Sequence, residues 1–485
     1  MASHIQEARA PSPALSSSSS DRRRLMLTVG LAVLGVFVTY VPITAVSVAL
    51  ATIGRATHAS TSDLQWVSDA YVIPMAAAVL SAGLFGDLYG RRRMFLSGMA
   101  LTLIGAAVAG LSGAFAHTAA LSMLWTGQAI SGLGAGLLLP TTLALIAHVV
   151  PDPRERGKYI GIWATGLLLG LAAGPLVSGV ILDHASYGWT FLPTVALAAL
   201  AGAAALVRLP ESKAPGGRRL DWPGQITGAL AIAASIYGVI EGGSKGWSAP
   251  VTIAGLGAGA AAFAAFIVAE RRSDSPLLNL TLFKSAVFTA AGFSALIALF
   301  SVVGVTFLLS LFLGYVQHLS ALQIGWRLLF ITGVAAVLNP VIGRVMHKVK
   351  VIYLLAVGLA VSAVSVFLLT GVGAHTSLAG LGWRLAIFGL SLAIMLTTVS
   401  VAAINAVPWK LAGMAAAANT AMRQYGSALG PAILGVIFVD RTSAGASPTS
   451  ALHTALVVNG ILLAVAALAC LLSARAPQRD ATQGK

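Results

Sequence analysis

The chain has 485 residues, of which 57% are apolar and only 9% carry a charge. Soluble proteins carry about 25% charged residues, so this composition excludes an ordinary soluble enzyme. The apolar residues suffice for about 14 bilayer spans of roughly 20 residues each, which also excludes a protein with a single anchor. Lys and Arg number 30 against 15 Asp and Glu. In a membrane protein such an excess is expected in cytoplasmic loops rather than on a nucleic-acid surface.

In chain order, the sequence begins with a polar, Ser-rich stretch. Residues 1–24 cannot form an apolar core, which predicts a disordered cytoplasmic tail. The apolar run that follows is longer than the core of a secretory signal and therefore predicts a membrane span. From there on, apolar runs between charged or Pro and Gly breaks predict fourteen helices. Their expected ranges are 26–53, 64–86, 94–116, 119–149, 158–182, 189–209, 224–241, 250–269, 286–315, 321–343, 350–371, 380–406, 413–439 and 452–473.

Basic residues fall mainly on one side of these predicted spans. If the N-terminus is cytoplasmic, 24 of the 30 Lys and Arg residues lie in inner segments. Because positive charge is enriched in the cytoplasmic loops of membrane proteins, both termini are predicted to be cytoplasmic.

An internal repeat divides the chain. Four positions of the fifth predicted span recur in the thirteenth at a constant offset of 256 residues. They are Gly170, Gly174, Pro175 and Gly179 in the fifth span and Gly426, Gly430, Pro431 and Gly435 in the thirteenth. Paired bundles related by a repeat are a transporter architecture, with substrate bound between them. We therefore expect an all-α polytopic membrane protein with a six-helix bundle over 25–210, an inserted helix pair with its linkers over 211–284, a second six-helix bundle over 285–474 and a cytoplasmic tail over 475–485.

A charged loop joins the second and third predicted spans. It reads Gly83-Leu84-Phe85-Gly86-Asp87-Leu88-Tyr89-Gly90-Arg91-Arg92-Arg93. Asp87 and Arg91 are four residues apart and can pair, whereas a basic loop that only stops translocation needs no Asp87. The loop resembles the cytoplasmic signature of the major facilitator superfamily. The resemblance implies the major facilitator fold and an inner gate formed by Gly83, Asp87, Gly90 and Arg91.

Three further segments resemble one branch of that superfamily, the fourteen-span drug/proton antiporters. They are Leu64-Gln65-Trp66-Val67-Ser68-Asp69-Ala70-Tyr71, the glycine series of the fifth span, and Glu270-Arg271-Arg272 with Pro276-Leu277-Leu278. The resemblance implies a bacterial plasma-membrane protein, functioning as a monomer, that exports a small lipophilic drug or antibiotic in exchange for protons by alternating access. It implies no cofactor and no metal, and the sequence contains neither a G-x-x-x-x-G-K-[ST] loop nor an H-E-x-x-H motif.

Small residues recur every fourth position in the fifth span. Gly166, Gly170, Gly174 and Ser178 form one narrow face that lets a neighbouring backbone approach closely, and Pro175 can bend the helix there. Such a stripe on its own indicates a packing seam. Its recurrence in the thirteenth span favours a paired hinge or sliding surface at the interface between the bundles. The predicted surface comprises Gly166, Gly170, Gly174, Pro175, Gly179, Gly426, Gly430 and Pro431.

Proton coupling requires a titratable group inside the membrane. Asp69, about one turn into the second span, is the best candidate, and the alternative is a solvated residue that caps the helix. Arg423, ten residues into the thirteenth span, is costly there unless it is paired or faces a cavity. It could hold an anionic substrate or a carboxylate partner, or only pack. Gln128 of the fourth span is a second cavity candidate.

Two positions depart from the pattern of the branch. Pro42 stands where many relatives carry an acid, and Gln128 where they carry an arginine. Both departures leave open an exporter of a neutral or anionic metabolite with weak or different ion coupling. A membrane sensor or scaffold that transports nothing is the alternative of another class.

Overall fold

The computed structural model describes residues 19–475 except 116, 151–152, 214–220, 347 and 408–410. The described residues form fourteen α-helices and three short 3-10 helices, and no strand occurs among them. The α-helices are α1 (Ser19–Thr57), α2 (Thr61–Tyr89), α3 (Arg91–Leu111), α4 (His117–Val149), α5 (Pro153–His184), α6 (Leu192–Arg208), α7 (Trp222–Lys245), α8 (Pro250–Arg272), α9 (Ala286–Tyr315), α10 (Ala321–Val345), α11 (Val351–Leu369), α12 (Leu378–Asn405), α13 (Ala412–Ser443) and α14 (Pro448–Arg475). The 3-10 helices are η1 (Ser112–Ala114), η2 (Tyr187–Phe191) and η3 (Leu280–Lys284).

Each of the fourteen predicted spans falls on one α-helix in the same order, so the all-α fold class is confirmed. The boundary of the N-terminal tail is wrong, because α1 begins at Ser19 and residues 19–24 are helical. The remaining tail segments, 1–18 and 476–485, lie outside the described residues.

Twelve of the described helices are long and apolar enough to cross a membrane, and α2 adds a thirteenth if Thr61–Val79 and Ser81–Tyr89 form one span. The helix without such a stretch is α13, which carries Asn419, Arg423 and Gln424 in its first half. The structure is therefore polytopic, and a fourteenth span through α13 stays a prediction.

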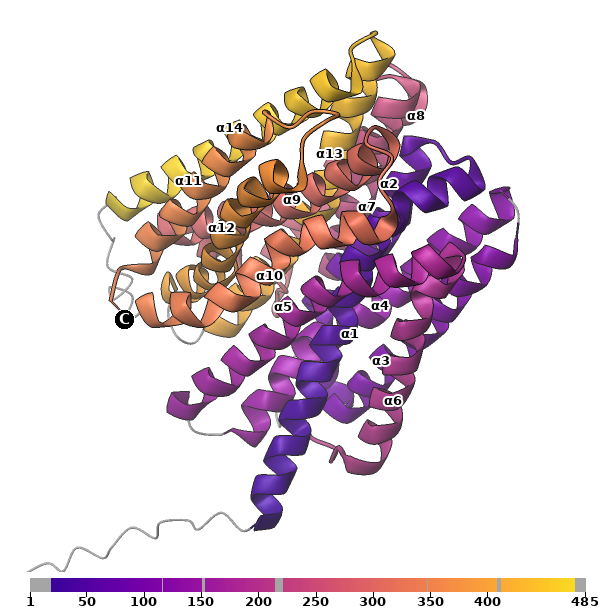
Figure 1. Ribbon diagram of the computed structural model, residues 1–485. Coiled ribbons are helices and arrows are strands. Elements are labelled where there is room, and N and C mark those ends of the chain that lie inside the picture. The colour runs from indigo at the N-terminus through magenta and orange to yellow at the C-terminus, as the bar shows by residue number, and fades with distance from the viewer. Residues whose placement is uncertain are drawn as a thin grey trace, which may run out of the picture.

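The helices form two bundles and a hairpin. Helices α1 to α6 pack on one another, and so do α9 to α14 (Figure 1). Helix α8 packs on α7, and α7 in turn contacts α2 of the first bundle and α13 of the second. In Figure 1, α1 begins at the bottom of the view and α14 ends at its left.

The sequence repeat is reflected in the packing. Helix α1 packs on α5 as α9 packs on α13, and the two bundles meet where α5 contacts α10 and where α2 contacts α13. Helices α2 and α10 also start alike, each with a Ser N-cap in a capping box, Ser60 with Asp63 and Ser320 with Gln323.

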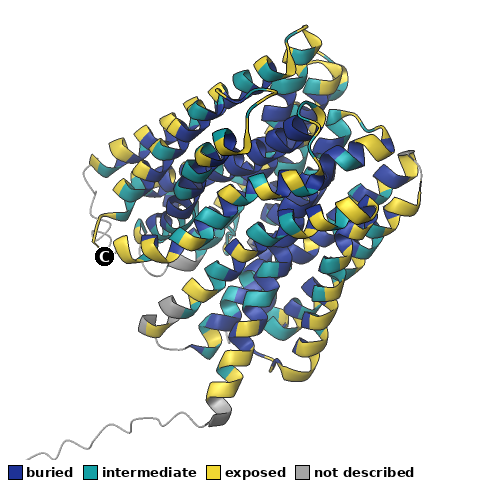
Figure 2. Cartoon of the chain, in the orientation of Figure 1, coloured by how far each residue is buried: buried dark blue, intermediate teal, exposed yellow. Residues whose placement is uncertain are grey.

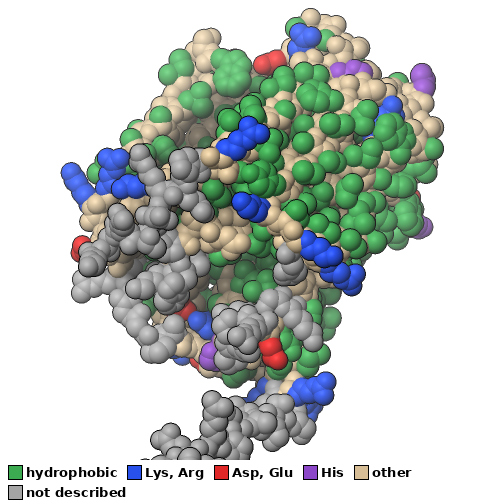
Figure 3. All heavy atoms as spheres, turned by 90° about the vertical axis from the view of Figure 1, so that its left-hand side faces the viewer, with side chains coloured by type: hydrophobic (Ala, Val, Ile, Leu, Met, Phe, Trp, Pro, Cys, Tyr) green, Lys and Arg blue, Asp and Glu red, His purple; other side chains and the backbone are tan. Residues whose placement is uncertain are grey.

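Burial follows the distance from the molecular axis. In the most apolar stretch of α9, 89% of the residues are buried, against 22% in α8 (Figure 2). Large apolar side chains on the outer surface are exposed, among them Leu200, Val207 and Ile253. Figure 3 shows such side chains covering the face at the right of the view. An exposed apolar surface of this extent suits a protein surrounded by lipid.

The bundles are packed together at the helix ends opposite the start of α1. Near the end of α1, Gly54 lies against the Tyr315 hydroxyl at the end of α9. Near the start of α2, the Gln65 side-chain amide donates to the carbonyl of Pro431 at 3.3 Å. These contacts close the side of the molecule that the positive-inside prediction places outside the cell.

Candidate functional site

A cavity lies where the two bundles meet. It has an empty volume of about 650 Å³ and is lined by α1 and α5 from the first bundle and by α9, α10, α12 and α13 from the second. Aliphatic side chains form much of its wall. The polar lining residues are Tyr40, Thr44, Ser47, Thr306, Thr332, Arg423, Gln424 and Ser427.

Arg423 is the one charged residue among those that line this cavity. Its residue surface is 8% exposed, and its Nε and Nη2 atoms have no hydrogen-bond partner in the described part of the chain. A buried guanidinium without partners is costly, so this position is suited to an anionic group that is not part of the protein.

A second, smaller pocket adjoins the cavity. Its empty volume is about 330 Å³, and helices α1, α2, α4, α9 and α13 line it. The two spaces have Ile43, Ser47, Val303 and Ser427 in common. Asp69 and Gln128 line the smaller pocket, so two of the predicted site residues lie next to the space that holds the third.

Asp69 is completely buried, and neither of its carboxylate oxygens has a hydrogen-bond partner among the described residues. The first turn of α2 is capped instead by Ser60 and Asp63, whose backbone and side-chain atoms bond reciprocally at 2.9 and 3.2 Å. The alternative interpretation of Asp69 as a solvated capping residue is therefore wrong. A carboxyl group in this position is stable mainly in its neutral form, because burying an unpaired charge is costly.

Gln128 belongs to the Asp69 pocket and is not among the residues that line the larger cavity. Its Nε2 atom donates to the carbonyl of Val67 on α2 at 3.2 Å. A few residues further along α4, Gly132 lies against the backbone of Tyr71. Gln128 thus holds α4 against α2 beside Asp69.

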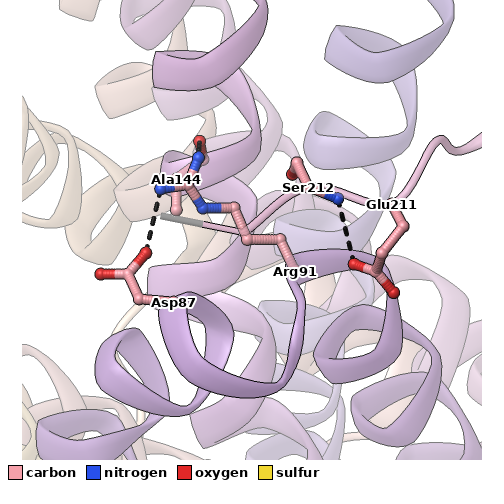
Figure 4. A network of polar contacts seen from close by, with 5 residues as sticks. All are labelled: Asp87, Arg91, Ala144, Glu211 and Ser212. Atoms are coloured by element: carbon pink, nitrogen blue, oxygen red, sulfur yellow. Dashed lines mark hydrogen bonds and ion pairs between the residues drawn. The ribbon is translucent and has the colours of Figure 1, made fainter. Parts of the chain in front are cut away.

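The predicted gate residues form a polar network at the end of α2 (Figure 4). Arg91 Nη2 lies 3.0 Å from Asp87 Oδ1, and Arg91 Nη1 donates to the Ala144 carbonyl of α4 at 3.2 Å. The Arg91 backbone N–H donates to the Ser212 carbonyl at 2.9 Å, which ties the α2–α3 turn to the segment after α6. The predicted pairing of Asp87 with Arg91 is present, and all these contacts lie within the first bundle and its following linker.

Glu211, which sequence reasoning missed, joins the same network. Its Oε1 accepts from the backbone N–H of Arg92 at 3.1 Å. Gly90 adopts a φ of 109°, and a Cβ there would collide with the Glu211 carboxylate. Glycine at this turn is therefore favoured by the backbone conformation, whereas the flexible Glu211 side chain could move away from a Cβ. Gly83 lies toward Pro140 of α4.

The small residues of α5 and α13 face their own bundles. A Cβ on any of the main stripe glycines would lie less than 3.0 Å from an atom of the first helix of the same bundle, which is closer than van der Waals contact allows. The pairs are Gly166 with Val33, Gly170 with Phe37 and Gly174 with Val41 on α1, and Gly426 with Leu296 and Gly430 with Phe300 on α9. This differs from the predicted location between the bundles.

The remaining residues of the predicted surface do reach the opposite bundle. Gly179 lies against Leu322 of α10, and the Pro175 carbonyl lies against Gly325. The Pro431 carbonyl accepts from Gln65 of α2. Pro175 follows Gly174 by one residue, which is a turn of about 100° around the helix, so the two residues face different neighbours.

Comparisons with known proteins agree with this architecture. A family model described as "Major Facilitator Superfamily" matches residues 32–431. The multidrug resistance protein Stp of Mycobacterium tuberculosis is 32% identical over 428 residues, which cover 88% of this chain and 78% of the relative. The tetracenomycin C resistance and export protein of Streptomyces glaucescens is 30% identical, over 87% of this chain and 78% of the relative. The methylenomycin A resistance protein of Bacillus subtilis is 31% identical, over 83% and 85%.

Solved structures show the same fold at lower identity. A crystal structure of a POT family transporter in complex with 5-aminolevulinic acid has a TM-score of 0.68 at 15% identity, and the match covers 93% of this chain and 96% of that one. At this identity the similarity concerns the fold alone.

Proposed function

The chain belongs to the major facilitator superfamily, and we propose that it exports a small lipophilic compound from the cytoplasm in exchange for protons. Relatives of about 30% identity are named for drug resistance and antibiotic export. The observation that carries the proposal is a cavity between the bundles, adjoined by a pocket with the buried, unpaired Asp69.

The cavity supplies the binding step. Its lining combines aliphatic side chains from both bundles with a few polar groups, which is the composition typical of small-molecule sites. Since both bundles line it, rocking one bundle against the other would expose the same site to each side of the membrane in turn. The present structure, closed at the helix ends opposite the start of α1, would be loaded from the cytoplasm.

Asp69 supplies the coupling step in this proposal. In its protonated form the side chain is neutral and compatible with a closed pocket, whereas its ionised form would draw water or a cation into the pocket. Release of the proton toward the cytoplasm and uptake from the outside would then accompany the change of access. The pocket shares four lining residues with the cavity, so a movement of these residues on protonation of Asp69 would also change the shape of the cavity.

The Asp87–Arg91 network would act as the inner gate. It holds the α2–α3 turn to α4 and to the linker after α6 through the contacts of Arg91 and Glu211. We place both termini in the cytoplasm, following the distribution of basic residues. Membership of the superfamily and the bacterial relatives support a bacterial plasma-membrane protein, which we propose to function as a monomer.

The test uses inside-out vesicles with an imposed pH gradient and three dyes, the cation ethidium, the neutral Nile red and the anion anilinonaphthalene sulfonate. The wild type should concentrate at least one dye when the gradient is applied. Asp69→Asn should reduce pH-driven uptake to the level of empty vesicles, because an amide cannot carry the proton.

The matched control is Asp183→Asn, which removes an exposed carboxylate at the end of α5 and should leave uptake unchanged. Unchanged pH-driven uptake in the Asp69→Asn protein would remove Asp69 from the mechanism. A folded wild type that moves none of the dyes would favour the sensor or scaffold over the exporter.

A further inference from the structure

We propose that the exported compound is a lipophilic organic acid and that Arg423 binds its ionised acid group. The inference rests on the proposed export function and adds the chemical class of the substrate. It begins from the lining of the cavity, in which one side chain is charged and that charge is positive.

The guanidinium of Arg423 is available for a ligand. Two of its three nitrogens, Nε and Nη2, have no partner among the described residues, although 92% of the residue surface is buried. Arginine presents adjacent N–H groups in a planar fork that matches the two oxygens of a carboxylate or sulfonate. An anionic ligand would therefore satisfy donors that the protein itself leaves unpaired.

Asp69 does not serve as the partner of Arg423 in this structure. Both oxygens of Asp69 lack a hydrogen-bond partner, and Asp69 lines the neighbouring pocket rather than the cavity. Tyr40, which also lines the cavity, has a neutral phenol and can orient the guanidinium or a ligand but cannot neutralise the charge.

The remainder of the cavity is suited to the apolar part of a ligand. Leu167 and Leu171 of α5, Leu299 and Val302 of α9 and Leu392 of α12 are among its lining residues. Hydroxyl groups at its edges, such as Thr44 and Thr332, can accept or donate single hydrogen bonds. An aromatic or alicyclic ring system with one acid group fits this distribution, with the acid directed toward α13.

The experiment measures binding to the purified full-length protein with three probes that share one ring system, naphthoate, naphthamide and naphthylmethylamine. Charge-assisted hydrogen bonds contribute about 1.5–3 kcal/mol, so naphthoate should bind the wild type roughly 10- to 100-fold tighter than naphthamide. Arg423→Gln should bind naphthoate no tighter than naphthamide, with the affinity for naphthamide unchanged.

Two variants separate recognition from folding. Arg423→Lys keeps the positive charge and should retain part of the preference for naphthoate. Arg327→Gln removes an arginine of α10 that donates to the Gln323 carbonyl outside the cavity, and it should bind all three probes as the wild type does.

The outcomes are distinct. A wild type that binds naphthamide or naphthylmethylamine as tightly as naphthoate, or that binds no naphthoate, overturns the inference, and so does an Arg423→Gln protein that keeps the preference. If the preference is present but reconstituted protein exports nothing, the proposed function fails while the acid-binding site stands.

Discussion

Helices α5 and α13 share three glycines and a proline at equivalent positions, but α5 lines the cavity with apolar side chains and α13 with polar and charged ones. Each packs its glycines on the first helix of its own bundle, α1 or α9, and each sends a proline carbonyl toward the other bundle. Yet at the constant offset of the repeat, Leu167 and Leu171 of α5 correspond to Arg423 and Ser427 of α13, and all four residues line the cavity. The repeat thus preserves the backbone framework while the side chains that line the cavity have diverged.

This difference separates two roles along one helix. At the equivalent pairs Gly170 with Gly426 and Gly174 with Gly430, the residue is small in both bundles, since a larger side chain would collide with the backbone of α1 or α9. Positions on the cavity face are free to change, because they meet solvent or ligand instead of a packed helix. A single pair of equivalent residues, Leu167 and Arg423, then decides the charge of the site.

The largest expected effect comes from breaking the shared framework. Gly174→Val would place its side chain against the Val41 carbonyl and the Ala45 backbone N–H, both under 3 Å from the Cβ position. Overpacking of this kind costs typically about 1–3 kcal/mol, and more where only backbone atoms can yield. We expect a lower thermal unfolding midpoint and a reduced yield of monodisperse protein in detergent.

The control for that substitution is on the same helix. Gly161→Val adds the same side chain where no atom lies within 4 Å, so its unfolding midpoint should stay close to that of the wild type. Equal loss of stability in both variants would mean that helix propensity, and not the α1–α5 seam, is responsible.

An intermediate effect is expected from exchanging the two walls. Arg423→Leu makes both walls apolar and should abolish the roughly 10- to 100-fold preference for naphthoate without lowering stability, since apolar replacement of a buried charge is often neutral or stabilising. The double variant Leu167→Arg with Arg423→Leu moves the guanidinium to the opposite wall and should restore part of the preference. A double variant that folds but shows no preference would indicate that the surroundings of α13 matter beyond the charge.

The smallest effect on stability is expected at the gate, which lies at the α2–α3 turn and not on α5 or α13. The Asp87 side chain is 41% exposed and pairs with Arg91 across the α2–α3 turn, and exposed ion pairs contribute about 0.2–1 kcal/mol. Asp87→Asn should therefore hardly change the unfolding midpoint, but it should slow pH-driven dye uptake if the network gates access. Uptake at the wild-type rate would mean that the charged loop only sets the orientation of the protein in the membrane and does not gate access.

The sequence predicts the helices well because membrane spans are long apolar runs. The order and the number of the predicted helices agree with the structure. The Asp87–Arg91 pair was predictable because only three residues separate the two, although the pair spans the α2–α3 turn at Gly90 instead of one continuous helix. The burial of Asp69 could also be predicted from the sequence, because Asp69 lies inside the second predicted span, nine residues after Ser60.

Other features depend on which helix lies opposite, and periodicity alone does not specify that. The glycine stripe identifies a close contact, but only the fold shows that α1 fills it. Likewise, two hydrogen bonds join residues that are 61 or more positions apart in the sequence. Gln128 donates to the Val67 carbonyl beside Asp69, and the Arg92 backbone N–H donates to Glu211. Glu211 offered one signal, an acidic residue directly after a predicted span and near an arginine cluster.

Helix α7 covers one of the two lateral contacts between the bundles, the α2–α13 contact, and leaves the α5–α10 contact uncovered on its lipid side. It runs along the α2–α13 contact, with Trp222 near Phe85 at one end, Tyr237 near Trp66 at the other, and Ser235 Oγ 2.9 Å from the Tyr425 hydroxyl between them. Among the described helices, no similar cover lies over the α5–α10 contact. A compound dissolved in the bilayer would thus meet a third helix on one face and only the direct α5–α10 contact on the other.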